Sequence, residues 1–257
     1  MHQIAKTHGF RCDAYKQGCI RRRIGARMRA RGVHRYDAYA ALLRRDPAES
    51  QRLLDALTIH VSRFYRNTET WDAIGAAVLP ALWGRRAGRL RCWSAGCAAG
   101  EEPYTLAMLL LEQAGRPGSP PLQSVIDATD YDGASLERAA GGSYSRTAIK
   151  DLPARWIRRY FEGHDPVVLA PDVRRLVRLA RHDLTRDPPP APPYDLVLCR
   201  NVAIYFDSPT QERILSLLTD ALAPGGCLIL GKVETIRGEA RARLVLENTR
   251  ERIYRLR

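Results

Sequence analysis

The stretch from Leu90 to Glu112 constrains the fold more than any other part of the chain. A short apolar run through Cys92 and Trp93 predicts a strand, and a loop of small residues, Gly96 to Gly100, follows it. Pro103 then stands where a helix would begin, and the apolar run after it supplies that helix. Strand, glycine loop and helix form the unit through which an α/β sheet lets its backbone approach a nucleotide-like ligand.

The chemistry of this loop narrows the choice of ligand. It lacks the Gly-Lys-Ser/Thr ending of a P-loop, and it carries two carboxylates, Glu101 and Glu102. Carboxylates repel a pyrophosphate, but they suit ribose hydroxyls, an amino group or a sulfonium. The loop therefore favours S-adenosylmethionine over ATP or NAD. Glycine turns also occur in purely structural βα units, so the interpretation depends on motifs elsewhere in the chain.

The rest of the chain after Leu90 alternates between apolar strand patterns and helical patterns. We predict strands over 125–129, 176–179, 194–199, 227–230 and 252–256, with helices over 134–140 and from 208 to about 222. This alternation predicts a doubly wound, Rossmann-like α/β sheet that binds its ligand at the carboxyl ends of the strands.

The first part of the chain has a helical pattern and no strand pattern. Ile20, Ile24 and Met28 recur every four residues, and two further amphipathic helices are predicted over 36–43 and 47–56. A linking helix is predicted over 71–83, with a glycine-containing hinge at 84–88. We therefore expect a small all-α domain over 1–70, a linker and hinge over 71–89, and a ligand-binding domain over 90–257.

Positive charge is concentrated in this first part. The formal net charge is +13, and residues 1–89 hold 18 basic against 7 acidic residues, a net charge of +11. A genome rich in G and C could explain why arginine outnumbers lysine, but it does not explain where the excess lies. A localised basic field favours an acidic partner, which could be nucleic acid, an anionic membrane face or an acidic protein surface.

Length and cysteine content exclude several classes of protein. No apolar run approaches the roughly 18 residues of a membrane span, and residues 1–20 lack the apolar segment of a secretory signal. The six cysteines form no CxxC pair and have no histidine partners at metal-ligand spacing. We expect a cytoplasmic protein with reduced cysteines, without a disulfide framework or a metal site.

Two strand ends carry candidate ligand contacts. Asp130 follows the predicted strand over 125–129, where doubly wound folds place an acidic residue that accepts from both ribose hydroxyls. The alternative is that Asp130 caps the next helix. Asn201 and Val202 follow the strand over 194–199, and the amide of Asn201 could hold an amino group or the adenine edge. A turn-stabilising role for Asn201 fits the spacing equally well.

Four motifs in order along the chain resemble the CheR family of chemotaxis-receptor glutamate methyltransferases. They are Leu57 to Arg66, Trp93 to Tyr104, Ala128 to Asp130 and Cys199 to Asp207. The resemblance runs from about Tyr15 to Tyr254. It implies a class I methyltransferase domain after a small all-α domain, with S-adenosyl-L-methionine as cofactor and S-adenosyl-L-homocysteine as product. It also implies transfer to glutamate side chains in the acidic, helical cytoplasmic region of chemoreceptors, in chemotaxis signal transduction.

The resemblance assigns roles to individual residues. Arg66 and Tyr205 match the residues that line the reaction centre, although singly they would be read as a surface ion pair and a core aromatic. The residues implied to contact the cofactor are His60, Ser62, Arg66, Gly96, Glu101, Asp130, Asp183, Leu184, Asn201 and Val202.

The chain departs from the family pattern at three places. His60 and Asp183 each stand where the family usually has Asn, and Lys232-Val233 stands where it commonly has His-Ser. His60 is titratable near neutral pH, and Asp183 lacks the amide donor that would lie near the adenine.

The implied reaction asks little of the protein beyond positioning. A glutamate side chain, with a pKa of about 4.3, is already an ionised nucleophile at neutral pH, so no general base is needed. An arginine can orient the incoming carboxylate with two hydrogen bonds.

For docking we name four arginines of the basic helix, which would meet the acidic receptor electrostatically: Arg21, Arg22, Arg23 and Arg29. A solvated basic face is the alternative. We expect a monomer that binds no nucleic acid and does not insert into a membrane.

Two other functions remain open. A nucleic-acid methyltransferase is weakened by the absence of an Asn/Asp-Pro-Pro-Tyr motif, a Pro-Cys nucleophile and an aromatic-rich basic stripe. A non-catalytic S-adenosylmethionine-binding regulator is left open by His60 and Asp183.

Overall fold

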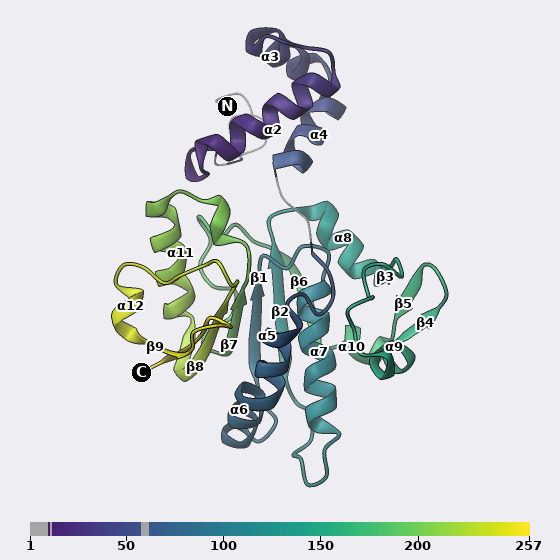
Figure 1. Cartoon of the computed structure of the whole chain (residues 1–257), viewed down its shortest axis with the longest axis vertical. Helices are drawn as coiled ribbons and strands as arrows, with labels where there is room; N and C mark the ends of the chain where they lie inside the picture. The colour runs from purple at the N-terminus through teal and green to yellow at the C-terminus, as the bar shows by residue number, and fades with distance from the viewer. Residues whose placement is uncertain (1–9, 11, 58–61) are drawn as a thin grey trace. The chain divides into compact units, whose positions relative to one another are not determined.

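The computed structural model describes residues 10, 12–57 and 62–257. The chain divides into two compact units (Figure 1). Unit 1 comprises Met1–His60 together with Tyr205–Gln211, and unit 2 comprises Val61–Ile204 together with Glu212–Arg257. Within the described ranges, no helix has both the length and the apolar character needed to cross a membrane.

Unit 1 is built from helices, as predicted. Its elements are η1 (Cys12–Ala14), α2 (Gln17–Ala30), α3 (Tyr36–Arg45) and α4 (Pro47–Leu57). The predicted apolar stripe of Ile20, Ile24 and Met28 is buried, each side chain being 6% exposed or less. The hydrophobic period therefore identified both the helix and the face that packs against α4.

A fully buried carboxylate organises this helical unit. Glu49 is 0% exposed; it accepts a hydrogen bond from the Tyr39 hydroxyl at 2.8 Å and from Arg27 Nη2 at 2.6 Å. Arg31 Nε lies 3.6 Å from the same carboxylate. Burial by itself raises the pKa of Glu49, but the hydrogen bonds from Arg27 and Tyr39 outweigh it and leave the pKa below its ordinary value.

Unit 2 is centred on a seven-stranded sheet with the order β6-β2-β1-β7-β8-β10-β9. The strands are β1 (Arg91–Ala95), β2 (Val125–Asp130), β6 (Val177–Arg181), β7 (Tyr194–Cys199), β8 (Leu222–Leu230), β9 (Leu244–Asn248) and β10 (Ile253–Leu256). The first five strands in that order are parallel, and β10 runs antiparallel to both β8 and β9. The strand order reverses between β1 and β7, which confirms the predicted doubly wound α/β fold.

Helices flank this sheet, and α7 lies against it (Figure 1). The helices are α5 (Thr68–Ala73), the π-helical turn η2 (Ile74–Val78), α6 (Leu79–Arg86), α7 (Glu101–Ala114), α8 (Gly133–Gly141), α9 (Ala154–Tyr160), α10 (Pro171–Arg174), η3 (Ala203–Tyr205), α11 (Ser208–Asp220) and α12 (Ala240–Arg243). The apolar run Leu106–Leu110 of α7 is buried throughout, so this helix is part of the core rather than a surface element.

The described structure differs from the predicted linker and hinge over 71–89. Helices α5 and α6 belong to unit 2, where Trp71, Ile74, Leu82 and Trp83 are each 2% exposed or less in the main hydrophobic core. A linker would leave such large apolar side chains in water, and their burial is favourable by about 1.5–3 kcal/mol each. The units divide at residues 60–61, before the predicted linker begins.

Three short strands form a second sheet that the sequence pattern did not predict. The order is β3 (Ser143–Tyr144), β5 (Val167–Leu169) and β4 (Phe161–Gly163), all antiparallel. Strands of two or three residues contain too few positions for an alternating pattern to be visible.

Replacing Glu49 with Gln tests the buried network. We expect Glu49→Gln to lower the stability of unit 1 by about 2–4 kcal/mol at neutral pH, because Arg27 loses its charged partner inside the bundle. The folded pKa is depressed, so this stability is present above the unfolded pKa and is lost as pH falls through the folded pKa. Thermal melting followed by circular dichroism between about pH 3 and pH 7 measures both effects.

The matched control is Glu137→Gln, which removes an exposed carboxylate from α8. It should melt as the wild type does at every pH. If Glu49→Gln retained the wild-type loss of stability on acidification, the buried carboxylate would not be its source.

Candidate functional site

The glycine loop after β1 is tied to the end of β2. The backbone amides of Gly96 and Cys97 both donate to the carbonyl of Thr129, at 2.8 and 2.9 Å. Three residues of the loop, Gly96, Ala98 and Gly100, have positive φ angles of 82°, 48° and 92°. This sequence of left-handed residues folds the loop back over the strand end, and glycine accommodates two of the three positions without strain.

At Gly96 a side chain is excluded by the loop that follows β7. A Cβ built on Gly96 would lie 2.4 Å from Cγ2 of Val202. Since β1 and β7 are the strands between which the order reverses, these two loops meet at the topological switch point, where open α/β sheets bind their ligands. The structure thus brings Gly96 and Val202, predicted from separate motifs, into one place.

Asp130 stands at the end of β2 beside the glycine loop. Its Oδ2 accepts from the amide of Ala98 at 2.8 Å, and its Oδ1 accepts from the amide of Asp132 at 2.9 Å. The alternative, that Asp130 caps the next helix, is wrong: the side chain of Asp132 caps α8 by accepting from Ser135.

The two carboxylates at the start of α7 have different surroundings. Glu102 accepts from the Ser94 hydroxyl at 2.9 Å and lies 3.5 Å from Nη1 of Arg200. Glu101 is 7% exposed, and its carboxylate accepts a hydrogen bond from the Ser62 hydroxyl. Its Oε2 has no hydrogen-bond partner in the described part of the chain. Burial raises the pKa of both. Glu102 thus has a structural role, whereas Glu101 retains an unused acceptor.

Arg200 connects this cluster to the segment that carries Arg66. Its guanidinium, 3% exposed, donates Nη2 to the Arg66 carbonyl at 2.8 Å and to Asn67 Oδ1 at 3.2 Å. It also lies 5.2 Å from the ring centroid of Trp71. Sequence reasoning did not single out Arg200, because an arginine after a buried strand gives no signal of its own without the spatial partners.

Arg66 is presented by a strained turn. Its neighbours Tyr65 and Asn67 both have positive φ, 56° and 61°, which non-glycine residues seldom adopt. Tyr65 is anchored by its amide to Thr105 Oγ1 at 3.2 Å and by its hydroxyl to Asp72 at 2.7 Å. The carbonyl of Arg66 accepts from Arg200, which also pairs with Glu102, so this turn is tied to the carboxylate through Arg200. Such strain, held by surrounding bonds, is characteristic of functional sites.

The loop after β7 is held by a carboxylate to which the sequence patterns assigned no role. Glu234, 5% exposed, accepts from the amides of Asn201 at 2.8 Å and Val202 at 3.0 Å. It also accepts from Gly231 at 2.7 Å. Burial raises the pKa of Glu234, while these amides lower it. Asn201, at φ 61°, keeps a buried Oδ1 without a partner among the described residues.

Asp183 and Leu184 follow β6, next to the end of β2. Asp183 Oδ1 accepts from the amide and the hydroxyl of Thr185, at 2.8 and 2.7 Å, so this oxygen stabilises its own turn. Leu184 is buried. His182, between the strand and Asp183, hydrogen-bonds the Asp130 carbonyl through its backbone amide at 3.0 Å. The turn that carries Asp183 therefore lies next to Asp130, the candidate for the ribose contact.

The remaining predicted residues lie elsewhere. His60 falls outside the described residues. Tyr205 belongs to unit 1, as do the four arginines of α2. Arg21, Arg22 and Arg29 are exposed, whereas Arg23 is half-buried and donates to the carbonyls of Ala56 and Leu57.

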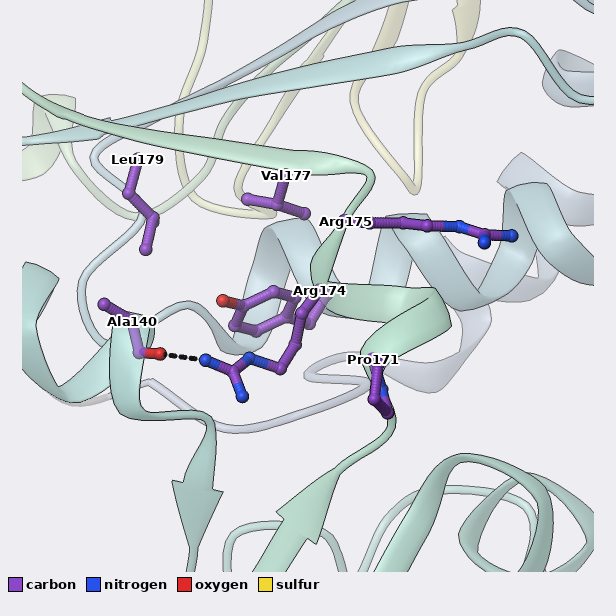
Figure 2. A pocket seen from close by; sticks show the side chains of 7 residues that line it. Ala140, Pro171, Arg174, Arg175, Val177 and Leu179 are labelled. Carbon is purple, nitrogen blue, oxygen red and sulfur yellow. Dashed lines mark hydrogen bonds between the residues drawn. The ribbon is translucent and has the colours of Figure 1, made fainter.

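Figure 2 shows a pocket of about 370 Å³ in unit 2 that involves none of the predicted site residues. It is lined by Tyr104, Ala140, Pro171, Arg174, Arg175, Val177 and Leu179. Arg174 lies along it and donates Nη2 to the Ala140 carbonyl at 2.6 Å.

In the described ranges, no three His, Cys, Asp or Glu side chains are grouped so that they could hold a metal ion. All six cysteines are free thiols, and five are buried.

The mostly parallel sheet, the glycine loop at its switch point and the acidic end of the neighbouring strand together define a class. This is the Rossmann-like, S-adenosylmethionine-dependent methyltransferase.

Two family models match the chain, one over each part. The model described as "CheR methyltransferase, SAM binding domain" matches residues 60–252, and "CheR methyltransferase, all-alpha domain" matches residues 2–58. The chain belongs to the CheR methyltransferase family.

Individual relatives cover the same two parts. A chemotaxis protein methyltransferase of Listeria innocua is 33% identical over 238 residues, 92% of this chain and 88% of that protein. Its counterpart in Listeria monocytogenes is 34% identical over the same shares. An uncharacterized 104.1 kDa protein of Rhodobacter capsulatus is 37% identical over 225 residues, 86% of this chain but only 23% of that protein.

The residues at the switch point fit S-adenosylmethionine. Two buried acceptors, Glu101 Oε2 and Asn201 Oδ1, are unsatisfied by the described residues, and buried polar atoms seldom remain so. The cofactor offers the complementary donors, an amino group and two ribose hydroxyls, and its positive sulfonium suits the acidic surroundings. Asp130, Glu101 and Asn201 are the residues that would hold it.

Replacing Asp183 with Asn tests whether this turn faces the cofactor. Asn can keep the bonds from Thr185 through Oδ1 and adds an amide donor where Asp183 has Oδ2. We expect Asp183→Asn to bind S-adenosylmethionine about 2- to 10-fold more tightly, the value of one added hydrogen bond, as measured by calorimetry.

The control is Asp187→Asn, which changes the carboxylate that accepts from the Asp183 amide at 2.7 Å in the same turn. Asp187→Asn should not bind S-adenosylmethionine more tightly than the wild type. Unchanged or weaker binding by Asp183→Asn would mean that this side chain does not face the cofactor.

Proposed function

We propose that this chain transfers a methyl group from S-adenosylmethionine to glutamate side chains of chemoreceptors. The observation that carries the proposal is the strained turn that holds Arg66, whose carbonyl accepts from Arg200, the ion-pair partner of Glu102 in a methyltransferase site. An arginine in this position suits a carboxylate acceptor. The Listeria relatives are named chemotaxis protein methyltransferases, which supports methyl transfer to a protein of the chemotaxis system.

The chemistry assigns the protein a positioning role. The bound cofactor supplies an activated methyl group. Arg66 orients the ionised acceptor carboxylate with its guanidinium, and the family resemblance gives Tyr205 a role in the reaction. Glu101, Asp130 and Asn201 fix the cofactor, and the buried loops exclude water. Positioning of this kind accounts for large rate enhancements without a general base.

The basic helix α2 supplies a docking surface for the receptor. Arg21, Arg22 and Arg29 are exposed on it, and α2 contains no acidic residue. A receptor cytoplasmic region rich in glutamate would approach such a surface under electrostatic attraction, and the interaction would weaken with salt.

The direct experiment uses methyl-labelled S-adenosylmethionine and a glutamate-rich receptor cytoplasmic fragment. Label that is released as volatile methanol in base identifies a carboxyl methyl ester and supports the proposal. Cofactor binding without base-labile label contradicts glutamate methylation and favours the non-catalytic regulator. Base-stable label on added nucleic acid would favour the nucleic-acid methyltransferase.

Replacing Arg66 with Ala separates turnover from cofactor binding. We expect Arg66→Ala to lower kcat roughly 100-fold, the effect of a misplaced reactant, with a much smaller loss of affinity for S-adenosylmethionine. Steady-state kinetics and calorimetry measure the two quantities.

Arg63→Ala is the matched control, because Arg63 lies in the same segment but pairs with Asp151 at 3.1 Å on the surface. It should leave kcat close to the wild-type value. Equal losses of turnover and cofactor affinity in Arg66→Ala would show that the arginine holds the cofactor instead of the acceptor.

A further inference from the structure

Unit 1 incorporates a segment that is far away in sequence. Tyr205–Gln211 belongs to it together with the helices of the first 57 residues. The segment is joined to residues 14–16 as a short antiparallel pair: Lys16 N donates to Tyr205 O, and Asp207 N donates to Ala14 O, both at 2.9 Å. The backbone of Tyr205 is therefore fixed by the N-terminal part of the chain.

Aromatic packing reinforces this pairing. The rings of Tyr15 and Phe206 lie with centroids 4.6 Å apart, and Phe10 stacks on Tyr15 at 4.8 Å. Phe206 is 5% exposed. Such packing holds the two strands of the pair in register, because a shift would expose both rings.

The side chain of Tyr205 is contacted by an arginine that is itself fixed. Arg23 Nη1 donates to the carbonyls of Ala56 and Leu57, at 3.0 and 2.7 Å, where α4 ends. The Cζ of Arg23 lies 5.6 Å from the centroid of the Tyr205 ring. The guanidinium thus bridges the end of α4 and the aromatic ring, a geometry that suits cation–π attraction.

Arg23 differs in this respect from the docking candidates on the same helix. Arg21, Arg22 and Arg29 are exposed, whereas Arg23 is half-buried. A guanidinium with two carbonyl partners and a ring has little freedom left to meet a receptor. In the sequence, Arg23 directly follows the exposed Arg21 and Arg22.

We propose that Arg23 is a positioning residue for Tyr205. Arg23 restrains the ring of Tyr205, and the antiparallel pair restrains its backbone. Together they fix the direction in which the tyrosine hydroxyl points. The effect on turnover rests on the proposed function, whereas the restraint on Tyr205 does not.

Fluorine NMR of the full chain labelled with 3-fluorotyrosine tests the restraint directly. The Tyr205 resonance is assigned by its loss in Tyr205→Phe. Arg23→Met keeps the length of the side chain and removes the guanidinium, so the Tyr205 resonance should shift and broaden. Arg45→Met, at an exposed position of α3 in the same unit, is the control and should leave the resonance unchanged.

Arg23→Lys keeps the charge and can donate to a carbonyl, but it lacks the planar fork. We expect its Tyr205 resonance to lie between those of the wild type and Arg23→Met. If Arg23→Met does not fold, as judged by circular dichroism, the Tyr205 resonance of Arg23→Lys tests whether Arg23 restrains the ring. An unmoved Tyr205 resonance in a folded Arg23 variant overturns the proposal.

Kinetics with the receptor fragment test the consequence for catalysis. Arg23→Met should lower kcat about 3- to 30-fold, the range of a cation–π contact, without weakening cofactor binding. Arg23→Lys should recover part of this loss. A rise in the receptor KM with unchanged kcat would make Arg23 a docking residue. If the wild type methylates no receptor fragment, the proposed function fails, and the fluorine spectra alone decide the role of Arg23.

Discussion

The arrangement of the site depends on the need to satisfy backbone amides where parallel strands end. Beyond its last residue a strand has no neighbour to accept its hydrogen bonds, and a buried amide without an acceptor is costly. In this chain, side-chain carboxylates meet that need. Asp130 accepts from Ala98 and Asp132, and Glu234 accepts from Gly231, Asn201 and Val202. These bonds fix the loops after β1 and β7, between which the cofactor-binding crevice is expected.

Burying those carboxylates has an electrostatic consequence. Desolvation raises the pKa of Glu101, Glu102 and Glu234, and each has compensating contacts. Glu102 is paired with Arg200 and Glu234 is surrounded by amides, whereas Oε2 of Glu101 has no hydrogen-bond partner among the described residues. A cationic ligand with donors would complete this environment. The local charge therefore favours S-adenosylmethionine on physical grounds, in agreement with the family to which the chain belongs.

Arginine has two distinct uses in unit 1. Arg27 and Arg23 are held by specific acceptors: Arg27 neutralises buried Glu49, and Arg23 bridges the end of α4 to Tyr205. Arg21, Arg22 and Arg29 are exposed and contribute to a basic surface. The basic residues in this part of the chain therefore do not all lie on one solvated face, because some of them make specific contacts that stabilise the helical unit.

The sequence predicted the fold class, the three N-terminal helices, most strands of the main sheet and the loop at the switch point, because each has a local pattern of period or composition. It did not determine that residues 71–86 belong to the core, that Asp132 rather than Asp130 caps α8, or that Arg200 and Glu234 organise the site. It also gave no sign that Arg23 of α2 contacts the ring of Tyr205. These features depend on contacts between segments more than 30 residues apart or on a choice between two nearby carboxylates, and only the tertiary structure decides which groups meet.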